Sequence, residues 1–315
     1  MNQVNKKIIS FAIPVFNNEG SLLKTYEKIN SLFKIHLIDY NFEIIFTNDG
    51  SKDNSLDELK LIREKDNRVK IIDFSRNFGQ VAATIASTRK STGDAVVIVS
   101  ADMQDPIFLV KEMIKEWENK EEIIICFRES RQDSFLNKLT SKIYFSMVQL
   151  HVKEEIPKGG FDFCLLDRNA VDSLNNINDK IRGLHYDILS LGFKKKYIPY
   201  KRLKREIGVS QYNFIMRLRD FTNAFISISF IPIRLIILIG FLISFTGIIY
   251  SISIFFSWLN GSTPFEGWAP IMVIILIIGG IIMIMLGIIG EYIWRIYEES
   301  KKRPNYIIRK IYDKQ

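Results

Sequence analysis

Short runs of aliphatic and aromatic residues alternate with longer amphipathic stretches through the first two-thirds of this 315-residue chain. Runs that are apolar throughout predict strands covered on both faces, and apolar residues every three or four positions predict helices. The predicted strands are Ile8–Ile13, Phe42–Thr47, Val69–Phe74, Val96–Val99, Ile123–Phe127, Phe161–Leu166 and Lys195–Pro199. The predicted helices start near Glu19, span Asp53–Glu64, start at Gly79 and span Pro106–Trp117. This alternation predicts an α/β domain with a mostly parallel sheet over residues 1–210.

The last third of the chain contains two long segments without a charged residue, Leu235–Leu259 and Ala269–Gly290. A helix needs roughly 20 apolar residues to cross a bilayer, and each segment is longer than that. We therefore expect a two-helix transmembrane hairpin with helices at residues 231–259 and 269–294. Buried helices of a soluble protein are the alternative, but two helices this apolar rarely occur in tandem at the end of a soluble chain.

Residues 211–230, between the predicted sheet domain and the hairpin, have apolar side chains at helical spacing. Charged and polar side chains occupy the rest of the helical wheel. We interpret this segment as an interfacial amphipathic helix that lies at the membrane surface, with a core helix as the alternative. The apolar positions are Phe214, Leu218, Phe221, Phe225 and Ile228.

The formal net charge of +8 is concentrated beside the predicted hairpin. Nine Lys and Arg residues lie between Lys194 and Arg219 against one acidic residue, and seven lie in a basic tail, 295–315, against three. The connection 260–268 has no Lys or Arg. The positive-inside rule then predicts a multi-pass plasma-membrane protein with the sheet domain and both termini in the cytoplasm. Anionic lipid explains this charge distribution better than nucleic acid does.

Polar side chains follow three of the predicted strands where those strands end. The carboxyl ends of parallel strands meet at one edge of a sheet, where ligands bind in open α/β folds, so we expect one site. Phe16, Glu19 and Asp49 are candidates to hold a base and a ribose. No Gly-x-x-x-x-Gly-Lys-Ser/Thr or Gly-x-Gly-x-x-Gly sequence is present, so no glycine loop cradles a phosphate here. The three clusters are Pro14–Glu19, Asn48–Asp53 and Ser100–Asp105.

The third cluster places two carboxylates and an amide within four positions, directly before Pro106. Oxygen ligands of this kind are those that Mg²⁺ or Mn²⁺ prefers, so we expect Asp102 and Gln104 to bind such an ion. Asp105 could instead cap the helix that Pro106 opens.

Taken together, the polar segments resemble the ordered motifs of the family 2 glycosyltransferases. Within that family the chain most resembles the polyprenyl-phosphate sugar transferases, such as dolichyl-phosphate mannose synthase and the bacterial undecaprenyl-phosphate glucosyltransferases. The resemblance implies a nucleotide-sugar-binding, GT-A-like domain ahead of the membrane segments, and it covers nearly the whole chain. It rests on Pro14–Glu19, Asn48–Ser51, Ser75–Gly79, Ala101–Pro106, Gly159–Phe163, Arg205–Tyr212 and Ile296–Glu299.

The resemblance also implies a reaction. A sugar would pass, with inversion and metal dependence, from a nucleotide diphosphate sugar to polyprenyl (undecaprenyl) phosphate, giving a lipid-linked donor for cell-envelope glycosylation. UDP-glucose is the expected donor, with other UDP- or GDP-sugars as alternatives. The implied cofactor is Mg²⁺ or Mn²⁺. The implied partners are the nucleotide sugar, the lipid phosphate and the membrane, without nucleic acid, and self-association into a homo-oligomer is left open.

Roles for individual residues follow from the same resemblance. The catalytic residues would be Asp102, Asp105 and Asp162, and the metal ligands Asp102, Gln104 and Ser100. Donor binding would involve Pro14, Phe16, Glu19, Asp49, Gly50, Ser51, Arg76, Gly79, Gln80 and Arg205. Acceptor binding would involve Arg128, Lys138, Ser141 and Arg202. The alternatives are a solvated helix face for Lys138, a buried structural carboxylate for Asp162, and general lipid attraction for Arg202 and Arg205.

Ser100 departs from the family pattern, because many relatives have Asp at the corresponding position. A hydroxyl is a weaker ligand than a carboxylate, so Asp102, Gln104, the diphosphate and water would have to hold the ion. This departure gives some support to a non-catalytic membrane scaffold, which is the alternative from a different class. A processive polysaccharide synthase shares the fold but usually carries more spans and a Gln-x-x-Arg-Trp motif, which this chain lacks.

Overall fold

The computed structural model describes residues 6–128, 146, 149, 161–177, 183–201, 231–260, 269–301 and 303–313. The chain divides into two compact units, one comprising Met1–Ser227 with Pro304–Gln315 and the other Ile228–Arg303. The predicted interfacial helix at 211–230 lies outside the described residues. So do four predicted site residues, Lys138, Ser141, Arg202 and Arg205.

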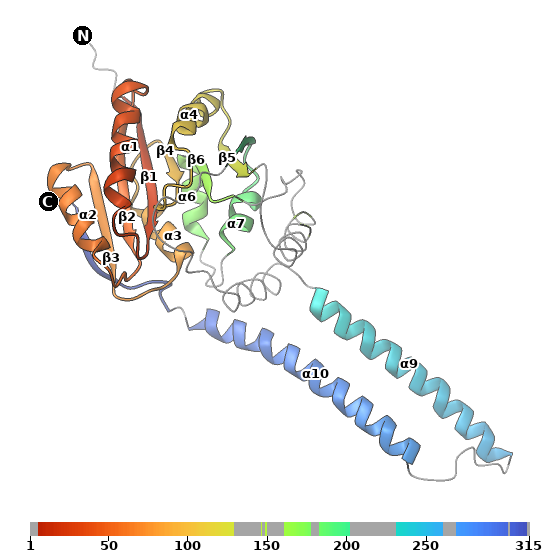
Figure 1. Ribbon diagram of the computed structural model, residues 1–315. Coiled ribbons are helices and arrows are strands. Elements are labelled where there is room, and N and C mark those ends of the chain that lie inside the picture. Colours follow the sequence, from red (N-terminus) through yellow and green to blue (C-terminus); the bar gives the residue numbers. More distant parts are fainter. Residues whose placement is uncertain are drawn as a thin grey trace. The chain divides into compact units, whose positions relative to one another are not determined.

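The first unit is built on an eight-stranded sheet in the order β7-β5-β6-β4-β1-β2-β3-β8 (Figure 1). Neighbouring strands are parallel except at the β4–β6, β5–β6 and β3–β8 pairings. The predicted α/β domain is therefore confirmed, but its sheet is mixed, since β6 and β8 run against their neighbours. The strands are β1 (Ile8–Val15), β2 (Asn41–Asn48), β3 (Val69–Phe74), β4 (Ala95–Ile98), β5 (Ile123–Arg128), β6 (Phe163–Asp167), β7 (Lys195–Tyr200) and β8 (Ile308–Tyr312).

Helices cover both faces of this sheet. One face packs against α1 (Leu22–Ile35), α2 (Ser55–Lys65), the 3₁₀ turn η1 (Ile107–Leu109) and α4 (Val110–Glu118). The other face is covered by α3 (Gln80–Lys90) and α6 (Arg168–Asn176), which contact each other. A further short helix, α7 (Leu184–Ser190), precedes β7.

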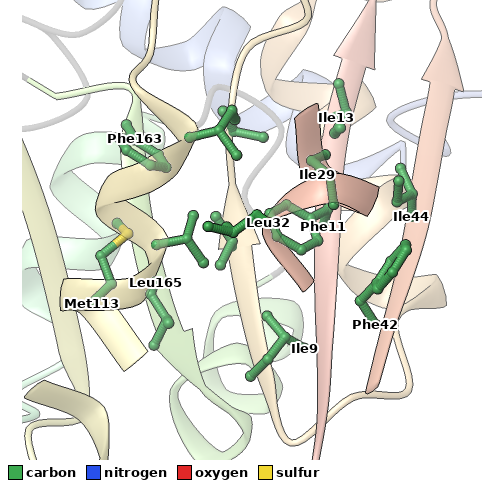
Figure 2. Close-up of a cluster of buried hydrophobic side chains, with 14 of the residues drawn as sticks. Ile9, Phe11, Ile13, Ile29, Leu32, Phe42, Ile44, Met113, Phe163 and Leu165 are labelled. Atoms are coloured by element: carbon green, nitrogen blue, oxygen red, sulfur yellow. The ribbon is translucent and has the colours of Figure 1, made fainter. Parts of the chain in front are cut away.

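The main core lies between the central strands and α1, α2 and α4. Alternate side chains of a strand point to opposite faces, so Ile9, Phe11 and Ile13 of β1 enter this core together. Figure 2 shows them beside Ile29 and Leu32 of α1. Each fully buried side chain of this size contributes about 1.5–3 kcal/mol, so this layer fixes the central strands on which the site is built.

Pro14 lies near the carboxyl end of β1, beyond the last residue that pairs with β4. β1 pairs with β2 up to Val15, but it pairs with β4 only up to Ala12. Alternate residues of a strand face the same neighbour, so Pro14 faces the β4 side beyond the last pair. Its missing N–H therefore leaves no ladder hydrogen bond unmade.

The C-terminal segment joins the sheet as β8, an antiparallel edge strand beside β3. The charge pattern of residues 295–315 indicates only a basic tail. In the structure this segment contains the end of a long helix, α10 (Ala269–Ser300), followed by β8. The first unit is therefore completed by residues from both ends of the chain.

The second unit consists of two long helices, α9 (Ile231–Leu259) and α10 (Figure 1). They contact each other, and a Cβ atom added at Gly240 of α9 would lie 3.4 Å from the side-chain methyl of Met285 in α10. Within the described residues one helix segment, Ile277–Trp294, is long and apolar enough to cross a membrane, and α9 contributes a shorter apolar stretch, Leu238–Tyr250.

Candidate active site

The register of the sheet brings the predicted site residues to one edge. β4 ends just before Ser100, and the antiparallel strand β6 begins just after Asp162, so these two residues meet at the same edge. β5 pairs Cys126 with Phe163, which brings Arg128 beside Asp162. The ends of β1 and β2 reach this edge as well, where the Asp49 N–H donates to the Val15 carbonyl at 2.8 Å.

Two buried carboxylates converge on one hydroxyl in the loop after β4. Ser100 Oγ lies 2.9 Å from Asp102 Oδ1 and 2.5 Å from Asp105 Oδ2. A hydroxyl carries a single proton, so Ser100 can donate to only one of the two at a time. The backbone N–H groups of Gln104 and Ser100 add weaker support, at 3.3 Å to Asp102 and 3.2 Å to Asp105. The loop therefore concentrates negative charge that burial makes costly.

The backbone of this loop is strained at one position. Met103, between Asp102 and Gln104, has φ +60°, a conformation that side chains other than glycine rarely adopt. Strain of this kind costs on the order of 1–3 kcal/mol and is concentrated at functional sites. The loop is also anchored to the residue before α1, because Ser21 Oγ donates to the Ala101 carbonyl at 3.0 Å.

Arg128 and Asp162 form an ion pair beside this loop. The Arg128 side chain is 11% exposed, and its buried Nε has no hydrogen-bond partner within the described part of the structure. Burial alone would lower the pKa of Arg128, but Asp162, Tyr200 and Asp105 together outweigh burial and hold this pKa above its usual value. The arginine is thus charged and desolvated, and among the described residues its Nε–H has no acceptor.

Tyr200 connects the ion pair to the carboxylate loop. Its hydroxyl donates to Asp105 Oδ1 at 2.9 Å and also interacts with Arg128. Burial and the nearby Asp105 charge raise the pKa of Tyr200, so the hydroxyl stays protonated. On the other side of Asp162, His185 lies 3.6 Å from Asp162 Oδ1 and contacts the Phe161 carbonyl.

Asp49 is the buried residue of the donor side. Its carboxylate accepts the backbone N–H groups of Phe78 at 2.6 Å and Gly79 at 2.9 Å, and burial raises its pKa. Gly50 follows at φ +67°, and a Cβ atom there would come within 2.5–2.9 Å of the Arg76 and Asn77 backbone. Glycine is therefore required for the turn after β2 to pack against loop 75–79.

The remaining donor-side predictions among the described residues lie at or after the ends of β1, β2 and β3. The Asn17 N–H donates to Ser51 Oγ at 3.0 Å, which joins the first two polar clusters. Glu19 accepts hydrogen bonds from the backbone N–H and side chain of Asn54 at 3.2 and 2.8 Å, so it has a structural role as well as its predicted one. Pro14, Phe16 and Ser51 are half-buried, while Arg76 and Gln80 are exposed.

The oxygen atoms of the Ser100–Asp105 loop fit the metal that the family implies. Mg²⁺ is usually bound by one or two carboxylates together with substrate phosphates, and Asp102, Ser100 and Gln104 offer hard oxygen donors of this kind. No group of three or more His, Cys, Asp or Glu that could hold an ion occurs among the described residues.

The structure thus groups the predictions into a carboxylate loop, an Arg128–Asp162 pair and a cluster in which Asp49 is bound by the Phe78 and Gly79 N–H groups. Sequence reasoning missed Tyr200 and His185. Tyr200 ends a strand that was predicted to stop at Pro199, so an aromatic residue with a polar tip at a strand end was the available signal. His185 gives no comparable signal, because only the fold brings it beside Asp162.

Comparisons with known proteins show the family of the chain. Residues 10–174 match glycosyl transferase family 2, and residues 231–296 match the GtrB C-terminal hairpin. A glycosyltransferase of Bacillus subtilis, CsbB, is 36% identical over 96% of this chain and 91% of its own length. A bactoprenol glucosyl transferase of Shigella phage SfV is 30% identical over 96% of this chain and 98% of its own.

Among solved structures, the mannosyltransferase PcManGT of Pyrobaculum calidifontis, in complex with GDP-Man and Mn²⁺, is 15% identical. It aligns with a TM-score of 0.49 over 70% of this chain and 63% of that chain. Because the family match covers more than half of the chain, and relatives at 30% identity or above match nearly all of it, the chain belongs to glycosyl transferase family 2 and is a glycosyltransferase.

Proposed function

We propose that this glycosyltransferase transfers glucose, with inversion, from UDP-glucose to the phosphate of undecaprenyl phosphate at the cytoplasmic face of the plasma membrane. The names of the bactoprenol glucosyl transferases support both the sugar and the lipid acceptor. The match to the GtrB hairpin supports membrane association, which a lipid acceptor requires.

The single observation that carries the proposal is the position of Arg128. Arg128 is buried, its Nε has no hydrogen-bond partner among the described residues, and it lies close to Asp105 in the loop whose Asp102 would hold a divalent ion. An enzyme that joins two phosphate-bearing substrates needs these two features next to each other. Asp162 keeps the guanidinium oriented, and a phosphate monoester would take the free Nε donor through a charge-assisted hydrogen bond.

The proposed reaction does not need a strong general base. A phosphate monoester loses its second proton near pH ~6, so at neutral pH the acceptor is largely a dianion and is already a nucleophile. The tasks left to the protein are positioning and charge neutralisation. Arg128 would orient the acceptor, and Asp105 and Tyr200 would keep Arg128 and the metal loop in a fixed relation. Asp162 would face the sugar or the acceptor.

The residues that would hold Mg²⁺ or Mn²⁺ are Asp102, Gln104 and Ser100. When bound, the ion would neutralise the diphosphate of the donor as it leaves. On the donor side, Phe16, Asp49 and loop 75–79 would hold the nucleotide, with Asp49 fixed by the N–H groups of Phe78 and Gly79.

We infer that α9 and α10 form the two-helix transmembrane hairpin predicted from the sequence. Both ends of this unit connect to the first unit, which contains residues on either side of it. A membrane crossing by a single helix would separate those residues, so two crossings are the consistent arrangement. The sheet domain and both termini would then lie in the cytoplasm.

The proposal is tested by incubating purified protein with undecaprenyl phosphate and a panel of radiolabelled nucleotide sugars, with and without EDTA. We expect label from UDP-glucose in the organic phase, and we expect EDTA to abolish it. Label from another nucleotide sugar would correct the donor. No lipid-linked label from any of them would favour the scaffold alternative.

A further inference from the structure

The C-terminal tail contacts the loop to which the proposed function assigns donor binding. Both backbone groups of Ser75, the first residue of loop 75–79, are bound by the tail. Its N–H donates to the Ile307 carbonyl at 3.0 Å, and its carbonyl accepts from Arg309 Nη2 at 2.9 Å. These contacts join positions that are more than 200 residues apart in the sequence.

A β-bulge directs Arg309 toward this loop. β8 pairs Lys310 with Asp73 and Ile308 with Phe74, so Arg309 is an extra residue between the two pairs. A bulge of this kind redirects a side chain, and bulges are concentrated next to active sites. The guanidinium of Arg309 also approaches Asp73, with Nη1 3.8 Å from Asp73 Oδ2.

Tyr306 supports the same loop from its apolar side. Its ring stacks on Phe74 with the centroids 4.9 Å apart and the planes inclined by 14°. Phe74 in turn packs edge-on against Phe78 at 5.6 Å. Tyr306 and Phe78 both pack against the small core cluster under α3, so the tail and the loop share one apolar contact surface.

The loop that is held in this way fixes Asp49, because the Phe78 and Gly79 N–H groups are the donors to its carboxylate. We propose that Arg309 and Tyr306 are positioning residues for the nucleotide-sugar site, an inference that rests on the proposed function. They hold loop 75–79 so that Phe78 and Gly79 orient Asp49 toward the donor. The segment that follows the membrane helix α10 is therefore a working part of the donor site.

The test compares Arg309→Ala with Lys310→Ala in the full-length protein. Both substitutions remove one positive charge from the same strand, but the bulge directs Arg309 toward loop 75–79, whereas Lys310 lies over the ring of Tyr312. Arg309→Lys is the conservative variant, because an ammonium group can still donate to the Ser75 carbonyl. Tyr306→Leu removes the stacked ring and keeps an apolar side chain.

Two readouts are measured for each variant. The first is KM for UDP-glucose against kcat. The second is amide hydrogen exchange at Phe78 and Gly79, which needs no substrate. We expect Arg309→Ala and Tyr306→Leu to raise KM by roughly three- to tenfold with little change in kcat, a size typical of residues in one contact network. We expect faster exchange at both amides, and Arg309→Lys should recover most of the loss.

Unchanged exchange at Phe78 and Gly79 in Arg309→Ala would overturn the inference. So would an equal rise in KM for Lys310→Ala, because the effect would then be general charge attraction. If the wild-type protein neither binds nor uses UDP-glucose, the proposed donor is wrong. Faster exchange in Arg309→Ala would still support the control of loop 75–79 by the tail.

Discussion

Tyr200 at the end of β7 donates its hydroxyl proton to Asp105 Oδ1, 2.9 Å away, across the two strands β5 and β6 that lie between them. The same hydroxyl interacts with Arg128, which pairs with Tyr200 in the sheet. One buried side chain therefore sets the spacing between the carboxylate loop and the arginine assigned to the acceptor.

Tyr200→Phe should lower kcat/KM for transfer by about tenfold, because Asp105 loses a hydrogen bond in a buried setting, a loss worth about 1–3 kcal/mol. The ring is kept, so its edge-on packing against Phe163 should be retained. The matched control is Tyr40→Phe, whose hydroxyl donates to Glu118 at 3.1 Å. Equal activity of the two variants would show that the Tyr200 hydroxyl does not position the site.

Metal binding should depend on Asp102 and should respond to Ser100. We expect Asp102→Asn to abolish Mn²⁺ binding measured by electron paramagnetic resonance in the presence of UDP. Ser100→Asp should tighten Mn²⁺ binding, because a carboxylate is a stronger ligand than a hydroxyl and replaces the group that lies 2.9 Å from Asp102. An unchanged Mn²⁺ affinity in Ser100→Asp would put residue 100 outside the ligand set.

The acid stability of the sheet domain should depend on Glu43. Burial alone would raise the pKa of Glu43, but hydrogen bonds from Lys70, Ser10 and Thr92 outweigh it and lower this pKa. A lowered folded-state pKa contributes stability above the unfolded value of about 4.3, and that stability is lost as the pH falls through the folded-state pKa.

Glu43→Gln should therefore lower stability at pH 7 by about 3 kcal/mol, because it leaves Lys70 nearly buried without its partner at 2.8 Å. The difference from wild type should shrink as the pH falls from about 4.3, the unfolded value, through the lowered folded-state pKa of Glu43. Thermal unfolding in detergent between pH 3 and pH 7 measures this difference in stability. Glu27→Gln, a substitution of an exposed glutamate, is the control. A stability difference that does not change with pH would contradict the link between Glu43 protonation and stability.

Membrane topology can be read from engineered cysteines. Cys126 and Cys164 are buried, and burial raises the pKa of both thiols, so they should give little background. A cysteine at Ser262 should react with an impermeant thiol reagent added to intact cells, whereas one at Gln315 should react only after lysis. The reverse pattern would overturn the topology.

The sequence predicted the central strands to within two residues because their aliphatic runs, such as Val96–Val99, are buried on both faces. It did not predict β8, since its Ile-Arg-Lys-Ile-Tyr sequence lies in a basic stretch and becomes a strand only by pairing with β3. The sequence did not predict the antiparallel direction of β6 either, because a hydrophobic run does not indicate whether its neighbouring strands are parallel or antiparallel to it.

The candidate site was also predicted only in part from the residue pattern. Asp49, Asp102 and Gln104 stood out as polar residues at strand ends, whereas Arg128 and Asp162 came from resemblance alone. The bridging role of Tyr200 depends on register between β5 and β7, which no local pattern encodes. Long-range hydrogen bonds of this kind are properties of the fold.

The central claim is that Arg128 holds the phosphate of a polyprenyl acceptor. The most direct measurement is kcat/KM for undecaprenyl phosphate in Arg128→Lys, beside calorimetric binding of UDP-glucose. Lysine has no planar guanidinium that can pair with Asp162 and present an N–H to the phosphate at the same time, so kcat/KM should fall roughly ten- to a hundredfold, from the loss of about 1.5–3 kcal/mol. Binding of UDP-glucose should stay close to that of wild type. An equal loss of both, or a wild-type protein that transfers no sugar to undecaprenyl phosphate, would contradict the account.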